Sequence, residues 1–280
     1  MRFSHRNTVL EWKRDGSPRA TTVLMLHGLS GISTGYDEVV DELGDDADVF
    51  RIDLRGHGRS DHAPNTYTVP FYTADVIEFV EQVISEPVVL VGHSLGGVIT
   101  HHITATRPDL VRAALCEDPP LYFCDQSLFE QSVFATIFPS LEAGMRSAQD
   151  RGEPREYFVS MVADAEMPWG RAGDHMSERA VQSRVDALML GDPDIWLPAI
   201  HGGALSGYDP DARITKPMII LQADPQMGPA LFPDHAERQH ASNPEVEIRL
   251  IDGAPHGIHS FLSSRERYVD AVRDIIRQAT

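Results

Sequence analysis

The sequence has few cysteines, little positive charge and no long apolar run. Its two cysteines, Cys116 and Cys124, provide neither a disulfide framework nor a zinc-ligand spacing. Only 24 Lys and Arg residues oppose 42 Asp and Glu residues, and the net charge of −18 disfavours binding to a polyphosphate. No apolar run approaches the roughly 20 residues that cross a bilayer, and the first residues do not resemble a signal peptide. We therefore expect a cytoplasmic protein that binds neither nucleic acid nor a membrane.

The remaining composition is that of a folded chain. Hydrophobic residues make up 42% of the sequence and charged residues 24%, which is enough apolar surface to build a core. A chain of 280 residues fits one large domain, or one domain with an insertion, better than two equal domains. The oligomeric state is left open by the composition, a homodimer included.

Short apolar runs alternate with segments of helical periodicity over most of the chain. Such alternation predicts an α/β fold, in which a mostly parallel sheet has helices on both faces. The expected strands are 21–26, 49–53, 87–91, 111–116, 217–221 and 246–251, and the expected helices are 36–43, 71–84, 95–106, 229–239 and 261–276.

The segment 119–212 interrupts this alternation. It lacks strand-like runs and is rich in aromatic residues, Met, Gly and Pro. We interpret it as a helical cap inserted into a core formed by residues 1–118 and 213–280. Such an insertion would lie over the carboxyl ends of the strands, where open α/β sheets bind ligands.

The strongest motif is Gly-His-Ser-Leu-Gly-Gly at residues 92–97, between an expected strand and an expected helix. It has the form G-x-S-x-G of a nucleophile elbow, which makes Ser94 the candidate nucleophile. The glycines are required because side chains at positions 92 and 96 would collide with the neighbouring strand and helix. The alternative is a plain strand–turn–helix junction in which the serine only caps the helix.

A serine hydroxyl needs a base, and the chain order expected for this elbow is Ser, then acid, then His. His256 is the favoured base because it lies in a Gly- and Pro-rich turn directly after the last expected strand. His259 is the competitor, but it falls at the start of the final helix, where lining the pocket or packing is the more natural role.

An oxyanion needs two preorganised N–H donors. Leu95, the residue after the nucleophile, provides one, and Leu29, in the loop after the first buried strand, is our choice for the other. Gly28 allows the backbone to approach a substrate, and Ser30 either donates its hydroxyl or begins a helix.

Together these motifs resemble the α/β-hydrolase fold superfamily, over residues 20–118 and 213–280. The resemblance also includes residues 53–60, Asp-Leu-Arg-Gly-His-Gly-Arg-Ser, which is similar to a structural turn of that family. It implies an eight-stranded, mostly parallel sheet and a Ser–His–acid triad.

The acid is where the sequence departs from the family pattern. The usual G-x-x-D after the cap would place Gln226 at the acid position, and Asp224 lies two residues early. Some relatives have the acid at the end of the preceding strand, where this chain has Asp118. We favour Asp118, then Asp224, then Glu117, although an Asp-Pro pair is also typical of a plain turn.

The predicted function is a cofactor-free and metal-free serine hydrolase that cleaves an ester or lactone of an apolar small molecule through an acyl-enzyme. Trp169 and Trp196 are the candidate pocket aromatics. The alternatives that use the same triad are a C–C bond hydrolase, a perhydrolase and an acyltransferase. A non-catalytic receptor on the same fold is the alternative from another class.

Overall fold

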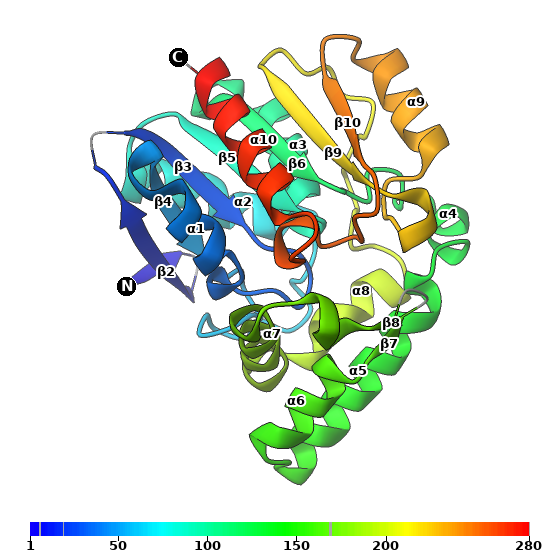
Figure 1. The fold of residues 1–280 in the computed structure, drawn as a ribbon. Coiled ribbons are helices and arrows are strands. Elements are labelled where there is room, and N and C mark those ends of the chain that lie inside the picture. The colour runs from blue at the N-terminus through cyan, green and yellow to red at the C-terminus, as the bar shows by residue number, and fades with distance from the viewer. Residues whose placement is uncertain (6, 19, 168–169, 280) are drawn as a thin grey trace.

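The computed structural model describes residues 1–280 except 6, 19, 168–169 and 280, and its centre is an eight-stranded sheet (Figure 1). The strand order is β1-β2-β4-β3-β5-β6-β9-β10. β2 pairs antiparallel with β1 and β4, and all other neighbours are parallel, so the predicted mostly parallel sheet is confirmed. The strands are β1 Arg2–His5, β2 Thr8–Gly16, β3 Thr21–Leu26, β4 Ala47–Ile52, β5 Val88–His93, β6 Val111–Glu117, β9 Met218–Ala223 and β10 Glu247–Ile251.

Helices cover both faces of the sheet, because the parallel strands expose apolar side chains on each side. α1 Asp37–Leu43 and α10 Arg265–Gln278 pack on one face, and α2 Val69–Phe79 and α3 Leu95–Thr106 pack on the other (Figure 1). α9 Pro233–Ser242 lies beside the edge strand β10. The shorter helical turns are η1 Ser33–Tyr36, η2 Gly44–Asp46, η3 Val80–Ile84, η4 Pro108–Leu110, η5 Ala172–His175, η6 Pro193–Trp196, η7 Pro225–Met227 and η8 Ile258–Ser260.

The segment between β6 and β9, called the insertion from here on, is mainly helical. It extends away from one end of the sheet (Figure 1). Its side chains reach the cavity at the end of β5 described below, which places it over the carboxyl ends of the strands. The insertion contains α4 Gln126–Glu130, α5 Phe134–Arg151, α6 Arg155–Ala163, β7 Glu166–Met167, β8 Gly170–Arg171, α7 Glu178–Leu190 and α8 Leu197–Ile200.

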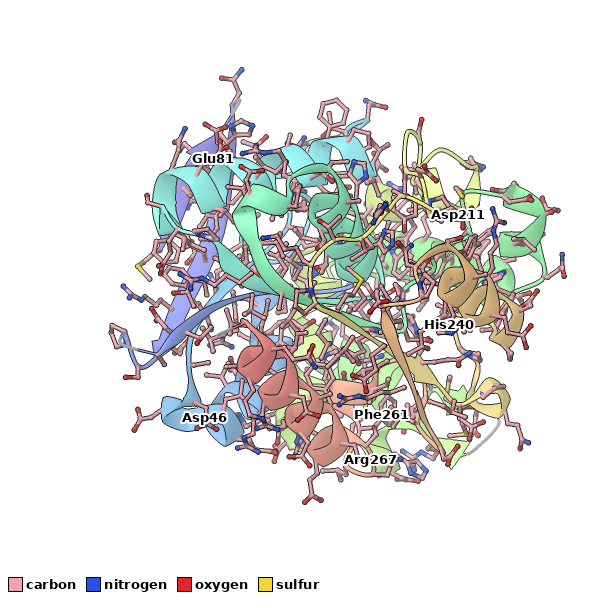
Figure 2. All side chains as sticks on the ribbon, turned by 90° about the horizontal axis from the view of Figure 1, so that it is seen from above. Asp46, Glu81, Asp211, His240, Phe261 and Arg267 are labelled. Atoms are coloured by element: carbon pink, nitrogen blue, oxygen red, sulfur yellow. The ribbon has the colours of Figure 1, made fainter. Side chains whose placement is uncertain are left out.

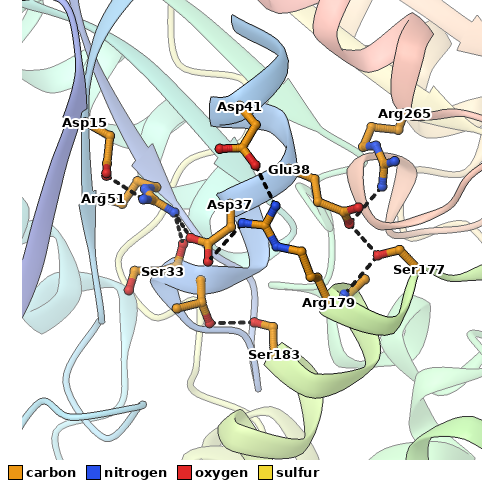
Figure 3. A network of polar contacts seen from close by, with 12 residues as sticks. Asp15, Ser33, Asp37, Glu38, Asp41, Arg51, Ser177, Arg179, Ser183 and Arg265 are labelled. Carbon is orange, nitrogen blue, oxygen red and sulfur yellow. Dashed lines mark hydrogen bonds and ion pairs between the residues drawn. The ribbon is translucent and has the colours of Figure 1, made fainter. Parts of the chain in front are cut away.

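Ion pairs fasten α7 of the insertion to α1 of the core (Figure 3). The Arg179 guanidinium lies 2.5 Å from the Asp41 carboxylate and 3.7 Å from that of Asp37. Glu38 accepts hydrogen bonds from Ser177 at the start of α7 and from Arg265, the latter at 2.9 Å. We call these six residues the α7–α1 network.

The turn at residues 53–60 has the structural role that the resemblance implies. Both carboxylate oxygens of Asp53 accept backbone amides, those of Ser33 at 2.7 Å and Arg59 at 3.1 Å. Arg55 forms a buried ion pair with Asp75 at 2.6 Å. These bonds use the side chains of Asp53 and Arg55 to stabilise the turn itself, which is a structural role.

Charged side chains are distributed around the outside of the molecule, as Asp46, Glu81 and Arg267 illustrate (Figure 2). Within the described residues, no helix combines the length and the apolar character that crossing a membrane requires.

Candidate active site

Ser94 occupies a sharp turn between β5 and α3. Its backbone is left-handed, with φ 51° and ψ −114°, a conformation that non-glycine residues rarely adopt. A Cβ at Gly92 would lie 2.1 Å from the Gly96 carbonyl oxygen, and one at Gly96 would lie 2.1 Å from the Leu26 carbonyl oxygen. Both glycines are therefore required for the turn, as the motif predicts.

His256 is bonded to Asp118, the residue that follows β6. The distance from His256 Nδ1 to Asp118 Oδ2 is 2.6 Å, and the Asp118 side chain is fully buried while His256 is 22% exposed. The carboxylate also accepts the amides of Ala223 at 3.1 Å, Ala230 at 2.7 Å and Leu231 at 3.3 Å. These bonds hold the carboxylate in one orientation toward the imidazole.

The two other candidate acids bind elsewhere. Asp224 accepts the amides of Gln226 at 2.8 Å and Gly253 at 2.7 Å, and these bonds lower the pKa of its carboxyl group. It therefore supports the loop before His256 and does not contact the imidazole. Glu117 binds His259, with 2.7 Å between Oε2 and Nδ1. Of the three acids that the sequence offers, the structure brings Asp118 to His256.

The loop after β3 lies directly against the nucleophile. A Cβ at Gly28 would come within 3.0 Å of Ser94 Cβ and 2.6 Å of His93 Nδ1, so only glycine allows this approach. The Leu95 amide is at the N-terminus of α3, where no intrahelical acceptor is available. In the described residues, no acceptor for the Leu29 amide is found, which leaves both N–H groups able to bind an oxyanion.

A cavity of about 420 Å³ opens at Ser94. Leu29 and Leu95 form part of its floor, and the insertion provides most of its walls. The ring of Phe134 lies 4.9 Å from the His256 ring, centre to centre. Among the described residues, its lining contains no charged side chain. The aromatic members are Tyr67, Tyr72, Phe123, Phe129, Phe134 and Phe138.

Several predicted pocket residues do not face this cavity. Trp196 is 1% exposed and its indole packs 4.9 Å from the Phe138 ring, behind the cavity wall, which corrects the expectation that it contacts substrate. Gly28 contributes the close approach described above, and Ser30 has a left-handed backbone (φ 59°) but does not line the cavity. Trp169 lies outside the described residues.

His93 is a site residue that the sequence analysis missed. Its Nε2 donates to the backbone carbonyl of His256 at 3.1 Å. Burial lowers the pKa of His93 well below its usual value, so the ring is neutral. The G-x-S-x-G motif allows any residue at the position that His93 occupies. The contact of His93 is to the backbone of a distant loop, so no residue pattern in the sequence predicts it.

One group of described residues has the composition of a metal site. The ligand atoms of His93, Glu117 and His259 lie within 4.8 Å of one another and all three residues are buried. Both Glu117 oxygens already accept hydrogen bonds from His259.

The chain belongs to the alpha/beta hydrolase family, whose model matches residues 23–271. The fold and the nucleophile elbow agree with this assignment.

Among known proteins, the chain is 30% identical over 242 residues to 2-(acetamidomethylene)succinate hydrolase of Mesorhizobium japonicum, covering 85% of this chain and 82% of that protein. A serine hydrolase-like protein of Danio rerio is 34% identical over 105 residues, which span 37% of this chain and only 32% of that protein. The solved enol-lactonase of Burkholderia xenovorans has a TM-score of 0.74 at 17% identity, with 99% of this chain and 100% of that chain covered. The last similarity shows the common fold.

Proposed function

We propose that this protein is a serine hydrolase that cleaves an ester or lactone of an apolar small molecule through an acyl-enzyme. The observation that carries the proposal is the position of Ser94. It lies on a strained elbow at the floor of an uncharged cavity, and His256 in the neighbouring loop is bonded to the buried Asp118. Membership of a hydrolase family supports the same reaction type.

In the proposed mechanism, Ser94 Oγ attacks the acyl carbonyl carbon while His256 Nε2 takes the hydroxyl proton. Asp118 accepts the Nδ1 proton of His256, which fixes the tautomer and stabilises the imidazolium that forms. The amides of Leu29 and Leu95 bind the tetrahedral oxyanion. His256 then protonates the leaving oxygen, and an activated water releases the acid from Ser94.

The lining of the cavity fits an uncharged acyl or aryl group, which we propose is the part of the substrate that the protein recognises. Phe123, Phe129, Phe134 and Phe138 offer apolar contact surface. No charged side chain of the part of the chain that the structure describes lines the cavity to pair with a carboxylate. The name of the Mesorhizobium relative describes a substrate with two carboxylates. We therefore expect this chain to act on a different, less polar substrate from that relative.

An active-site-directed fluorophosphonate tests the proposal. The wild-type protein should bind one phosphonate per chain at Ser94, because the elbow exposes a serine with a base beside it. Ser94→Ala is the matched control and should bind none. Hydrolysis of p-nitrophenyl esters of increasing acyl length, alongside lactones of matched size, then separates an esterase from a lactonase.

A folded wild-type protein that binds no phosphonate would remove the serine-hydrolase proposal and favour a non-catalytic receptor. Turnover of an ester that persists in Ser94→Ala would leave the hydrolase class intact but remove the acyl-enzyme.

A further inference from the structure

A second acid–imidazole pair, Glu117 and His259, lies next to the pair formed by Asp118 and His256. Glu117 directly precedes Asp118, and because side chains alternate along a strand, the two carboxylates point in different directions. Glu117 is fully buried. Its Oε1 accepts the His259 backbone amide at 2.8 Å, and its Oε2 lies 2.7 Å from His259 Nδ1, which must therefore donate its proton.

This second pair is connected to the catalytic loop at two points. His93 and Glu117 are register partners in the adjacent strands β5 and β6, and each directly precedes a proposed triad member. His93 binds the carbonyl of His256 at 3.1 Å, and Glu117 binds the amide of His259. The residues before the nucleophile and before the acid thus hold both ends of the four-residue segment that begins with the catalytic histidine.

We propose that Glu117 and His259 are positioning residues which, together with His93, hold the His256 imidazole between Ser94 and Asp118. This inference rests on the proposed hydrolase function, since it assigns a role toward the same base. If the pair only held the 256–259 loop in place, a neutral hydrogen-bonding side chain at position 117 would serve equally well. The buried carboxylate adds a negative charge that favours the protonated imidazole of the transition state.

The groups around the pair determine how a change in pH acts on it. Tyr36 of η1 and Tyr268 of α10 have ring centres 4.7 and 5.6 Å from that of His259, and burial raises the pKa of both tyrosines, so they are neutral. Ser260 Oγ lies 3.1 Å from His259 Nε2. The guanidinium of Arg184, on α7, is the cation whose field reaches Glu117. His93 is neutral, and in the part of the chain that the structure describes, the ionisable side chains of Asp118 and His256 complete these surroundings.

The test compares Glu117→Gln with Tyr268→Phe, a control that keeps the ring beside His259, removes only the buried hydroxyl and changes no hydrogen bond of Glu117. In Glu117→Gln we expect kcat on the best ester to fall about 100-fold with KM changed less than about twofold, because a small misplacement of the base affects the chemical step. The acid limb of the pH–rate profile should move to lower pH, since a negative charge near His256 is lost. Tyr268→Phe should change neither quantity.

His259→Asn provides the rescue. Its side-chain amide can donate to Glu117 from a position close to that of Nδ1, so it should retain at least tenfold more kcat than His259→Ala, whose cavity lacks the donor. This pair also keeps the inference testable where Glu117→Gln fails to fold.

A proton NMR measurement reports on position without turnover. The downfield proton of His256 Nδ1, identified by its loss in Asp118→Asn, should shift or broaden in Glu117→Gln and remain in place in Tyr268→Phe. A wild-type protein that binds no phosphonate would remove the proposed function, while this proton would still decide whether the pair positions His256.

Three results would overturn the inference. The first is a folded Glu117→Gln variant with an unchanged downfield proton, kcat and pH profile. The second is an equal loss of kcat in Tyr268→Phe. The third is one equivalent of metal in the purified wild-type protein that is absent from Glu117→Gln, because the cluster of His93, Glu117 and His259 would then be a metal site.

Discussion

At the scale of single residues, the acid beside His256 is defined by its backbone donors. Asp118 accepts the amides of Ala223, Ala230 and Leu231 in addition to the imidazole proton. A carboxylate with four donors cannot rotate away from the histidine without breaking several charge-assisted bonds. The site therefore holds His256, the proposed general base, in one tautomer before a substrate arrives.

Asp118→Asn should lower kcat by about 10⁴, because an amide in this position favours the wrong histidine tautomer. Asp224→Asn should leave kcat within about threefold, since Asp224 binds only the amides of Gln226 and Gly253. The measurement is kcat on the p-nitrophenyl ester that the wild-type protein hydrolyses best. Comparable losses in both variants, with both proteins folded, would contradict the assignment.

The sequence predicts Ser94 and His256 as nucleophile and base because their motifs require particular residue types at fixed spacing. It ranks Asp118 first among the acids but leaves Asp224 open, because the donors that distinguish them are backbone amides and have no side-chain signature. His93 and the Phe residues of the cavity were not singled out for similar reasons. Their roles depend on which loop or helix the fold brings opposite them, which local patterns do not encode.

At the scale of elements, the buried strands were the most predictable part. The run 21–26 is β3 without adjustment, because a continuous apolar segment between turns leaves few alternatives. The sequence predicts a helix from residue 229, but α9 begins at Pro233, because Phe232 before the proline is extended (φ −69°, ψ 158°) and the proline takes the first helical position. β1 and β2 were missed, because β2 is only partly buried and contains charged residues.

Ion pairs contribute to the attachment of α7 to the core. Exposed ion pairs each contribute about 0–1 kcal/mol to stability. The α7–α1 network therefore stabilises the position of α7 but still allows the helix to open locally. Arg179→Met removes the contacts to Asp37 and Asp41. We expect faster hydrogen exchange in residues 178–190 and a small change in Tm.

Arg273→Met is the matched control for this prediction. Arg273 pairs with Asp46 in the core and does not contact the insertion. Mass-spectrometric hydrogen exchange should therefore show no change in α7 for this variant. Salt at about 1 M should reproduce the Arg179→Met effect in the wild-type protein, because it screens exposed pairs. Exchange that is insensitive to both changes would show that the ion pairs of Arg179 do not hold α7.

At the scale of the whole molecule, buried histidines make the fold sensitive to acid. Burial lowers the pKa of His27 to about 4, of His57 to about 3 and of His101 to about 4. In the unfolded chain these groups titrate near 6.5, so between these values the unfolded state binds more protons. The free energy of unfolding is therefore expected to be highest above pH 6.5 and to fall as the pH drops toward 4.

His101→Gln tests this sign. His101 is bonded to Tyr208 and Gln239 in the core and has no role in the proposed chemistry. Urea unfolding between pH 4.5 and 7.5 should give a shallower pH slope for the variant, by about one proton near pH 5. A variant slope equal to that of the wild-type protein would show that His101 takes up its proton in the folded state.

Three of the six non-glycine residues with positive φ in the described chain are Ser30, Ser94 and Asp118. A residue held in such a conformation costs about 1–3 kcal/mol, and glycine would relieve most of that cost. Replacing Ser94 by glycine would abolish the proposed chemistry while relieving this strain, whereas Asp118→Gly would also leave three buried amides without their acceptor. Selection for stability and selection for catalysis therefore act in opposite directions at Ser94, and a screen that rewards heat resistance alone would favour losing the proposed nucleophile.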